Sequence, residues 1–373
     1  MCSGREPACG WISSELTPDP GLNGLGWSLD FAPVAFRLAM ARFAIVLLAL
    51  CLTACSIVPP AARVASAAQV VSAPSEPVTL WQDAGIFRLV ARLIGFSRTR
   101  VMVEMYELGR RDIVSALGSA RVRGVAVRVI TDPTVRASRR SSAALDSLGV
   151  AERVYPVDDV RHQIDHVKLL IADDEAVVGG MNWGSHSDRN HDYVLETRDP
   201  PEIARLVRIF DQDWALAGGR PAPLAPSRSD VAQTAPGDEI RVMLEDALVR
   251  AHERVLAEVY TLTDAEVIAG LVAAHRRGAV VRVLLDPNQP YNRHAYVLLS
   301  AGGVEVRWYP VPKGALLHAK VGLFDGELVL GSANWTLSGL GVNHELEIET
   351  GDPRTVSAYR TRFDSDWSRS GGG

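Results

Sequence analysis

The sequence has little cysteine, no excess of basic charge and no long apolar run. All four cysteines of the 373-residue chain lie within its first 55 residues, so the rest can form neither a disulfide framework nor a cysteine-rich zinc site. Lys and Arg number 39 against 44 Asp and Glu, a net charge of −5, which does not attract polyanions as a DNA-coating protein does. The chain is 47% hydrophobic and 22% charged, which excludes disorder, collagen and coiled coil.

An apolar segment near the N-terminus contains two of these cysteines. It covers residues 43–58, only 16 residues, which is at or below the short limit for a helix that crosses a bilayer. Residues 52–55 (LTAC) resemble a bacterial lipobox, which implies a lipoprotein signal over residues 40–54 and acylation of Cys55. The protein would then be exported and lipid-anchored in the cell envelope, and residues 1–39 would be an over-extended gene start. The alternative is an uncleaved N-terminal transmembrane anchor.

The remainder of the chain is an internal repeat. Seven blocks match in one order at offsets of 152 to 154, and the longest pairs residues 123–133 (RGVAVRVITDP) with residues 277–287 (RGAVVRVLLDP). The segment between the halves is rich in Pro, Ala, Ser and Gly, as is typical of a linker. We therefore predict a signal region (1–54), a tether (55–77), a first domain (78–216), a linker (217–238) and a second domain (239–370).

Each half alternates strand-like and helix-like segments. Residues 101–108 and 126–132 are short apolar runs that predict strands, and residues 112–123 carry apolar side chains at helical spacing between them. The second strand is apolar almost throughout, as in a sheet buried on both faces. Further strands and a closing helix follow, and the second half repeats the whole pattern. The sequence therefore predicts two α/β/α domains with mixed sheets.

One polar motif occurs twice at matching positions. His166 and Lys168, like His318 and Lys320, are two residues apart, so each pair shares one face of a strand. An aspartate five residues after each lysine falls on the opposite face, where we expect it to hold the following turn by accepting backbone hydrogen bonds. Small residues after the turn let the backbone and an asparagine amide approach a ligand. The residues after each lysine are Asp173, Gly180 and Asn182 in the first copy, and Asp325, Ser332 and Asn334 in the second.

Together the two copies supply two imidazoles, two ammonium groups, two amides and one hydroxyl. This set fits one anionic phosphorus centre, where one imidazole attacks phosphorus to form a phosphohistidine and the other protonates the departing alcohol. The lysines and asparagines would stabilise charge on the equatorial oxygens. Each imidazole also needs a partner that orients its second nitrogen. Asp192 and Glu345, in the matched triplets NHD and NHE, are the candidates.

The repeated pattern His-x-Lys-x4-Asp, followed by Gly-(Ser/Gly)-x-Asn, resembles the HKD signature of the phospholipase D superfamily. The resemblance covers nearly all of residues 78–367. It implies two similar α/β domains related by a pseudo-twofold axis, HKD segments that meet at their interface, a phosphohistidine intermediate and no metal. It also implies that His166 is the nucleophile and His318 the acid. Gly180 replaces the usual serine, as in bacterial cardiolipin synthases, which removes one hydroxyl from the expected phosphate-binding set.

The motif residues do not show which chemical groups the substrate carries on either side of the phosphate. We expect a phospholipase D-like enzyme without a cofactor that cleaves or transfers phospholipid headgroups at a membrane surface. The first alternative is a non-specific, metal-independent endonuclease of the same superfamily, which the acidic net charge disfavours because phosphate-backbone binding depends on Lys and Arg. A more remote alternative is an inactive binding lipoprotein of the envelope.

Other titratable residues carry less information. A metal-dependent phosphodiesterase needs clustered ligands, and the sequence has no HExxH or comparable cluster, so no metal site is predicted. Glu104 and Glu258 recur within apolar strands as candidates for buried carboxylates, and their role, structural or in the site, stays open. The histidines outside the motif, His191 and His344 among them, are expected to be surface or structural residues.

Overall fold

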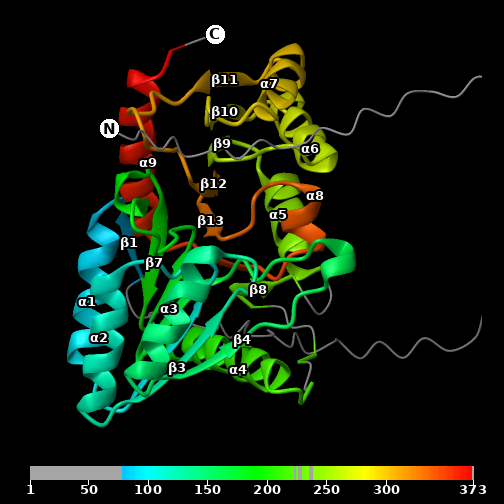
Figure 1. Ribbon diagram of the computed structural model, residues 1–373. Coiled ribbons are helices and arrows are strands. Elements are labelled where there is room, and N and C mark those ends of the chain that lie inside the picture. Colours follow the sequence, from blue (N-terminus) through cyan, green and yellow to red (C-terminus); the bar gives the residue numbers. More distant parts are fainter. Residues whose placement is uncertain (1–77, 222–223, 226–228, 235–237, 372–373) are drawn as a thin grey trace, which may run out of the picture. The chain divides into compact units, whose positions relative to one another are not determined.

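The computed structural model describes residues 78–221, 224–225, 229–234 and 238–371 (Figure 1). These residues belong to one compact unit. None of the helices in this part of the chain is long and apolar enough to span a bilayer. The predicted signal region, the acylation site Cys55 and the tether lie outside the described residues.

The first half forms a seven-stranded mixed sheet. Its elements are β1 (Thr79–Gln82), α1 (Gly85–Phe96), β2 (Arg100–Met105), α2 (Arg111–Val122), β3 (Ala126–Thr131), α3 (Arg136–Ser147), β4 (Ala151–Val154), β5 (Lys168–Ala172), β6 (Glu175–Gly179), β7 (Tyr193–Thr197) and α4 (Pro200–Ala217). The strand order is β1-β7-β6-β5-β2-β3-β4. Strands β2, β3 and β4 run parallel, and the other neighbours are antiparallel.

The second half repeats this architecture in a second seven-stranded sheet. Its elements are β8 (Val231–Gln233), α5 (Glu239–Arg250), β9 (Arg254–Val259), α6 (Ala265–Arg276), β10 (Val280–Leu285), α7 (Asn292–Ala301), β11 (Glu305–Trp308), β12 (Lys320–Phe324), β13 (Glu327–Gly331), α8 (Leu337–Gly341), β14 (Leu346–Thr350) and α9 (Pro353–Arg369). The order β11-β10-β9-β12-β13-β14-β8 mirrors the first sheet. The predicted fold class, a duplicated α/β protein with mixed sheets, is confirmed.

Alternate residues of the central strands explain the layers. In β2, Val101 and Val103 pack with α1, α2 and α3, whereas Met102 packs on the other face with residues of α4. In β9, Val255 likewise packs with α5 and α6, and Leu256 lies on the face toward α9. Because successive side chains of a strand point to opposite faces, each sheet is covered by helices on both sides.

A single hydrophobic cluster joins the two halves. It includes Leu169 of β5, Phe210 of α4, Val321 of β12 and Phe363 of α9, all of them buried. This shared core fixes the two sheets with respect to one another, since apolar surface from both halves leaves water together. The segment before β5 is therefore held close to the segment before β12.

Part of the predicted linker belongs to the second sheet. Residues 231–233 form β8, which pairs with β14 as the last strand of the order. Val231 and Ala232 are buried there. The sequence did not predict this strand. The segment around it is rich in Pro and Ser, and three residues are too few to show a periodicity.

Candidate active site

The two motif histidines occupy equivalent places where the halves join. His166 lies two residues before β5 and His318 two residues before β12, so each precedes its strand instead of lying within it. The His166 backbone N–H donates to the carbonyl of His344, and the His318 N–H donates to the carbonyl of His191, each at 2.8 Å. Both bonds cross from one half to the other. The two imidazoles are buried, at 5% and 6% exposed.

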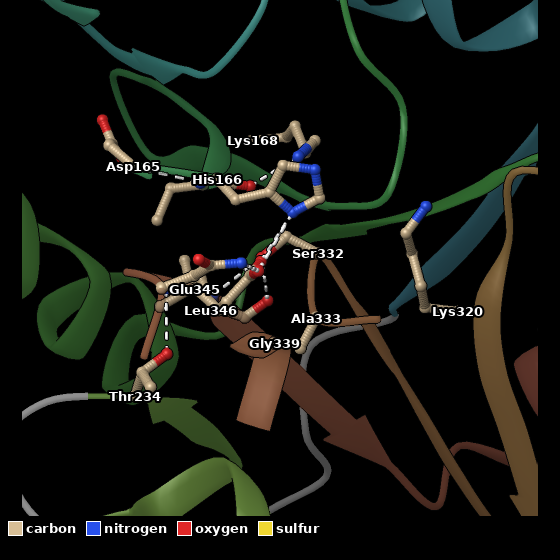
Figure 2. Close-up of polar contacts among 12 residues, drawn as sticks. Asp165, His166, Lys168, Thr234, Lys320, Ser332, Ala333, Gly339, Glu345 and Leu346 are labelled. Carbon is tan, nitrogen blue, oxygen red and sulfur yellow. Dashed lines mark hydrogen bonds and ion pairs between the residues drawn. The ribbon is translucent and has the colours of Figure 1, made fainter. Parts of the chain in front are cut away.

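The carboxylates that orient these histidines are exchanged between the halves. Glu345 of the second half lies 2.8 Å from Nδ1 of His166 in the first (Figure 2). Asp192 of the first half lies 2.7 Å from Nδ1 of His318 in the second. A carboxylate at Nδ1 fixes the ring and its tautomer and leaves Nε2 for chemistry. The sequence identified both carboxylates but gave no sign that each serves the opposite half.

Ser332 supports Glu345 and does not stand as a free phosphate ligand. Its hydroxyl donates to Oε2 of Glu345 at 2.6 Å and accepts the N–H of Leu346 at 2.9 Å, and the residue is fully buried. The hydroxyl of Ser332 is thus engaged with Glu345 and Leu346, and its phosphate contact stays a prediction. Although burial opposes ionisation, His166, Lys168 and this hydroxyl keep the pKa of Glu345 below its usual value.

Gly180 makes room for the other orienting carboxylate. A Cβ atom at this position would lie 2.3 Å from Oδ1 of Asp192, which is closer than real contacts allow. Oδ1 also accepts the N–H of Tyr193 at 2.8 Å, so the carboxylate is fixed in place. A side chain at this position would therefore collide with Asp192, and the phosphate-binding role of Gly180 stays a prediction.

Asn182 and Asn334 carry side-chain amides at matching positions of the two halves. The Oδ1 atom of each is buried, yet it has no hydrogen-bond partner within the described residues. Buried amide oxygens are nearly always paired in folded proteins. An amide oxygen accepts hydrogen bonds and cannot donate one to a phosphate, so a phosphate contact would have to come from the NH2 groups of these asparagines. Their phosphate-binding role stays a prediction.

The lysines lie close to both histidines. Nζ of Lys168 donates to the carbonyl of His166 at 2.5 Å, Nζ of Lys320 donates to the carbonyl of His318, and each ammonium lies about 5 Å from a tyrosine ring centre. Figure 2 draws Lys168 beside the His166 ring and Lys320 farther away on the right. The charges of both lysines help to lower the pKa of His166, although burial is the larger cause. The two lysines and two histidines therefore share one electrostatic environment.

Burial lowers the pKa of all four groups. It lowers the pKa of Lys168 to about 7 and that of Lys320 to about 8. Burial and the neighbouring lysines bring His166 to a pKa of about 4 and His318 to about 3, against the opposing effect of their carboxylates. A negative phosphoryl group beside them would reverse these shifts, because it stabilises each protonated form.

The motif aspartates hold a different segment from the one expected. Asp173 follows β5 with φ +51° and accepts the backbone N–H groups of residues 98–100, which lead into β2. Asp325 does the same for residues 252–254 before β9. Their structural role stands, but they tie neighbouring strands together and do not close their own turn.

Two further histidine clusters lie behind the motif. His344, whose carbonyl binds His166, has its Nε2 at 3.0 Å from Asp213 and 3.5 Å from Glu104. All three side chains are buried. The pKa of Glu104 rises to about 7, because burial and the nearby Asp213 outweigh the effect of His344. Burial disfavours the imidazolium, but the pKa of His344 still rises well above its usual value because of Asp213 and Glu104.

The second cluster repeats this arrangement around His191. Its Nε2 lies 3.3 Å from Asp366 and 3.4 Å from Glu258. In each cluster one ligand atom per residue lies within 4.8 Å of the others, a spacing that could hold a metal ion. The sequence showed no sign of these clusters, because their side chains come from distant segments, and the prediction that the protein has no metal site stays a prediction. Glu104 and Glu258 belong to the clusters, and His191 and His344 are buried, not exposed at the surface.

Comparison with solved structures shows the fold class. Phosphatidylserine synthase from Haemophilus influenzae superposes with a TM-score of 0.61, at 13% identity over 78% of this chain and 86% of that chain. Polyphosphate kinase from Porphyromonas gingivalis gives 0.59, at 18% identity over 80% of this chain and 49% of that chain. At these identities the likeness concerns the fold alone, a duplicated α/β architecture.

Sequence comparison identifies the family. Residues 90–214 and 244–367 each match the family described as cardiolipin synthase, PLD-like domain. The chain thus belongs to the phospholipase D superfamily. It is 30% identical over 114 residues to a mitochondrial cardiolipin hydrolase of Danio rerio, covering 30% of this chain and 50% of that protein. It is 28% identical over 111 residues to the protein of the same name from Chlamydomonas reinhardtii, and this match covers 29% of this chain and 49% of that protein. The chain spans about half the length of these curated relatives.

Proposed function

We propose that this protein is a phosphodiesterase that cleaves or transfers phospholipid headgroups through a phosphohistidine. The observation that carries the proposal is the exchange of carboxylates, which anchors Nδ1 of both motif histidines within one buried group of two imidazoles and two lysines. Two imidazoles that are each held at Nδ1 by a carboxylate suit a double displacement at phosphorus, one as nucleophile and one as proton carrier.

The proposed reaction has two steps. In the first, Nε2 of His166 attacks phosphorus, the bond to the leaving alcohol breaks, and the alcohol oxygen takes the Nε2 proton of His318. In the second, water or another alcohol attacks phosphorus and gives its proton to His318, and the bond between phosphorus and His166 breaks. Both residues return to their starting states.

The lowered pKa values suit these roles at different moments. A pKa of about 4 keeps His166 unprotonated and nucleophilic at neutral pH. His318 has to be protonated when the alcohol leaves, although burial brings its pKa to about 3 without substrate. The negative phosphate of the substrate raises that pKa. The enzyme would therefore take up a proton as it binds substrate.

The positive charge that the reaction needs is available from the protein itself. Lys168 and Lys320 lie beside the histidines, and a bound phosphoryl group would favour their charged forms. We therefore propose a metal-independent reaction. Dialysis against EDTA should leave turnover unchanged, whereas a loss of turnover that Zn²⁺ restores would assign a catalytic role to a metal held by one of the His-carboxylate clusters.

A phospholipid substrate is supported by the family and by the predicted anchor. The matching family model is described as cardiolipin synthase, and the curated relatives are named cardiolipin hydrolases. Acylation at Cys55 would place the site beside membrane phospholipid. We propose export to the cell envelope on this ground, and intact-mass measurement of the membrane-extracted protein tests it, since any mature N-terminus other than a lipid-modified Cys55 contradicts it.

Substrate assays test the function directly. The full chain in detergent is incubated with vesicles of phosphatidylglycerol or phosphatidylcholine, and separately with single- and double-stranded DNA, beside a His166→Ala control. Release of headgroup or formation of phosphatidic acid supports the proposal. Cleavage of DNA alone would make the protein an endonuclease, and no cleavage of either substrate would support the inactive binding lipoprotein.

A further inference from the structure

A pocket of about 510 Å³ opens beside the proposed active site. Its walls come from both halves, from the turn after β2 and the loop after β6 on one side, and from the loops after β10 and before β12 on the other. The catalytic account gives it no role. The lining residues are Glu107, Ser185, His186, Ser187, Asn190, Asn288, Gly314, Ala315 and Leu316.

The pocket lining lies next to residues that contact the catalytic groups. Glu107 follows Tyr106, whose ring centre lies 4.7 Å from that of His166. Burial raises the pKa of Glu107, and Lys168 is close enough to oppose that rise. The two walls of the pocket are also joined to each other, because Oδ1 of Asn190 accepts the N–H of Leu316 at 3.1 Å. The Glu107 wall of the pocket therefore adjoins residues that contact His166 and Lys168.

The lining favours one chemistry of ligand. It offers a carboxylate at Glu107, an imidazole at His186, an amide at Asn288 and the serine hydroxyls, and it contains no Phe, Tyr or Trp ring. Quaternary ammonium groups are recognised by aromatic faces, so a choline headgroup finds no cage here. Hydroxyl groups pair with carboxylate, amide and imidazole as donors and as acceptors. Within the described residues the Glu107 carboxylate has no hydrogen-bond partner of its own.

The second half has no matching pocket chemistry at the equivalent positions. In the alignment of the repeats, Thr261 replaces Glu107 and Leu337 replaces Ser185. Leu337 is 71% exposed, so an apolar side chain stands where the first half presents a hydroxyl. The polar pocket thus lies on one side of a site that is otherwise nearly symmetric. Such a difference can distinguish the two substituents of a phosphodiester.

We infer that this pocket is the subsite for the alcohol portion of the substrate and that it selects a polyhydroxy headgroup, with Glu107 and Asn288 as specificity-determining residues. The inference rests on the proposed function and deepens it. The Glu107 carboxylate accepts hydrogen bonds from the headgroup hydroxyls, and the polar wall of the first half directs the headgroup away from Leu337.

The test compares headgroups in the full-length enzyme. Glu107→Ala should lower kcat/KM on phosphatidylglycerol vesicles by about ten- to a hundredfold, the usual effect of losing a hydrogen bond that reads a substrate hydroxyl. Turnover of phosphatidylcholine and of bis(p-nitrophenyl) phosphate should change by less than about threefold, because neither uses that bond. Thr261→Ala, at the equivalent position, is the matched control and should preserve the ratio between the two lipids.

Several results would overturn the inference. An equal loss on all three substrates would mean that Glu107 acts on the chemistry through Lys168, and a wild-type preference for phosphatidylcholine would contradict a polyhydroxy headgroup. Calorimetric titration with glycerol 1-phosphate and phosphocholine separates this inference from the proposed function. If no lipid is cleaved, the proposed function fails. The pocket assignment still stands if glycerol 1-phosphate binds more tightly and loses that advantage in Glu107→Ala, and it falls if the two bind equally.

Discussion

Around His166 the orienting carboxylate is a glutamate that a serine hydroxyl supports, whereas around His318 it is an aspartate beside a glycine. The side chain of Asp192 is one methylene shorter than that of Glu345, so its backbone has to come closer to the imidazole. Gly180 leaves the space for that approach, and Ser332 fills the equivalent space. The two halves have therefore diverged in pairs of residues while keeping the same bond to Nδ1.

The buried clusters behind the two histidines differ in charge. Beside His191, Arg362 donates to Asp366 at 2.7 Å and lies 3.2 Å from the imidazole. Ile209 stands at the matching position of the first half, and Asp165 adds a buried carboxylate near His344. Burial raises the pKa of Asp165 and of Glu104. One cluster is thus neutralised by an arginine and the other by bound protons.

The largest effect should come from removing the exchanged carboxylates. Glu345→Gln and Asp192→Asn should each lower kcat by about 10²- to 10⁴-fold, since an imidazole without its anionic partner loses its orientation and its tautomer. NMR of the imidazole nitrogens checks the exchange itself. Glu345→Gln should shift the His166 signals and leave those of His318 nearly unchanged, and Asp192→Asn should do the reverse. A shift confined to the histidine of the same half would contradict the assignment.

A smaller loss is expected from exchanging the residues beside the carboxylates. Gly180→Ser should reduce kcat by about 10- to 100-fold, because its Cβ would displace Asp192 and overpacking of this kind costs about 1–3 kcal/mol. Ser332→Gly leaves a cavity and removes the two hydrogen bonds of the hydroxyl, to Glu345 and from Leu346, an effect of about 1–3 kcal/mol on stability. Steady-state kinetics and thermal unfolding of both variants measure this. Wild-type activity in Gly180→Ser would show that Asp192 does not depend on the glycine.

The smallest effect concerns stability and pH. The pKa of Glu104 is about 7 in the folded protein against 4.5 for the free residue, so between these values the folded state binds more protons than the unfolded state. Its contribution to stability is present below about pH 4.5 and is lost as the pH rises through 7. Glu104→Gln should therefore gain stability relative to wild type between pH 5 and pH 8, by roughly 1–3 kcal/mol. Glu258→Gln is the comparison variant, because Glu258 contacts His191, the histidine that Arg362 also approaches. Denaturant unfolding at pH 5 and pH 8 measures this. If the free energy of unfolding of Glu104→Gln differed from that of the wild type by the same amount at both pH values, neutralisation of the His344 cluster by bound protons would be refuted.

The sequence predicted the duplicated fold because the matched blocks fall on strands and helices that bury their apolar residues. It also identified the catalytic candidates, because His166, Lys168 and their counterparts recur at fixed spacing. It could not show which carboxylate serves which histidine, since Glu345 is 179 residues from His166. The clusters of His191 and His344 were missed for the same reason. The edge strands β1 and β8 were missed because strands of four and three residues show no periodicity.

Peptide mapping of the covalent intermediate tests the central claim most directly. The enzyme is mixed with excess bis(p-nitrophenyl) phosphate, denatured within the first turnovers at alkaline pH to preserve a phosphohistidine, digested and analysed by mass spectrometry. We predict a nitrophenyl phosphoryl group on His166, and none in His166→Ala. An adduct on His318 would reverse the two roles. Turnover without an adduct on either histidine would contradict the double displacement across the junction of the halves.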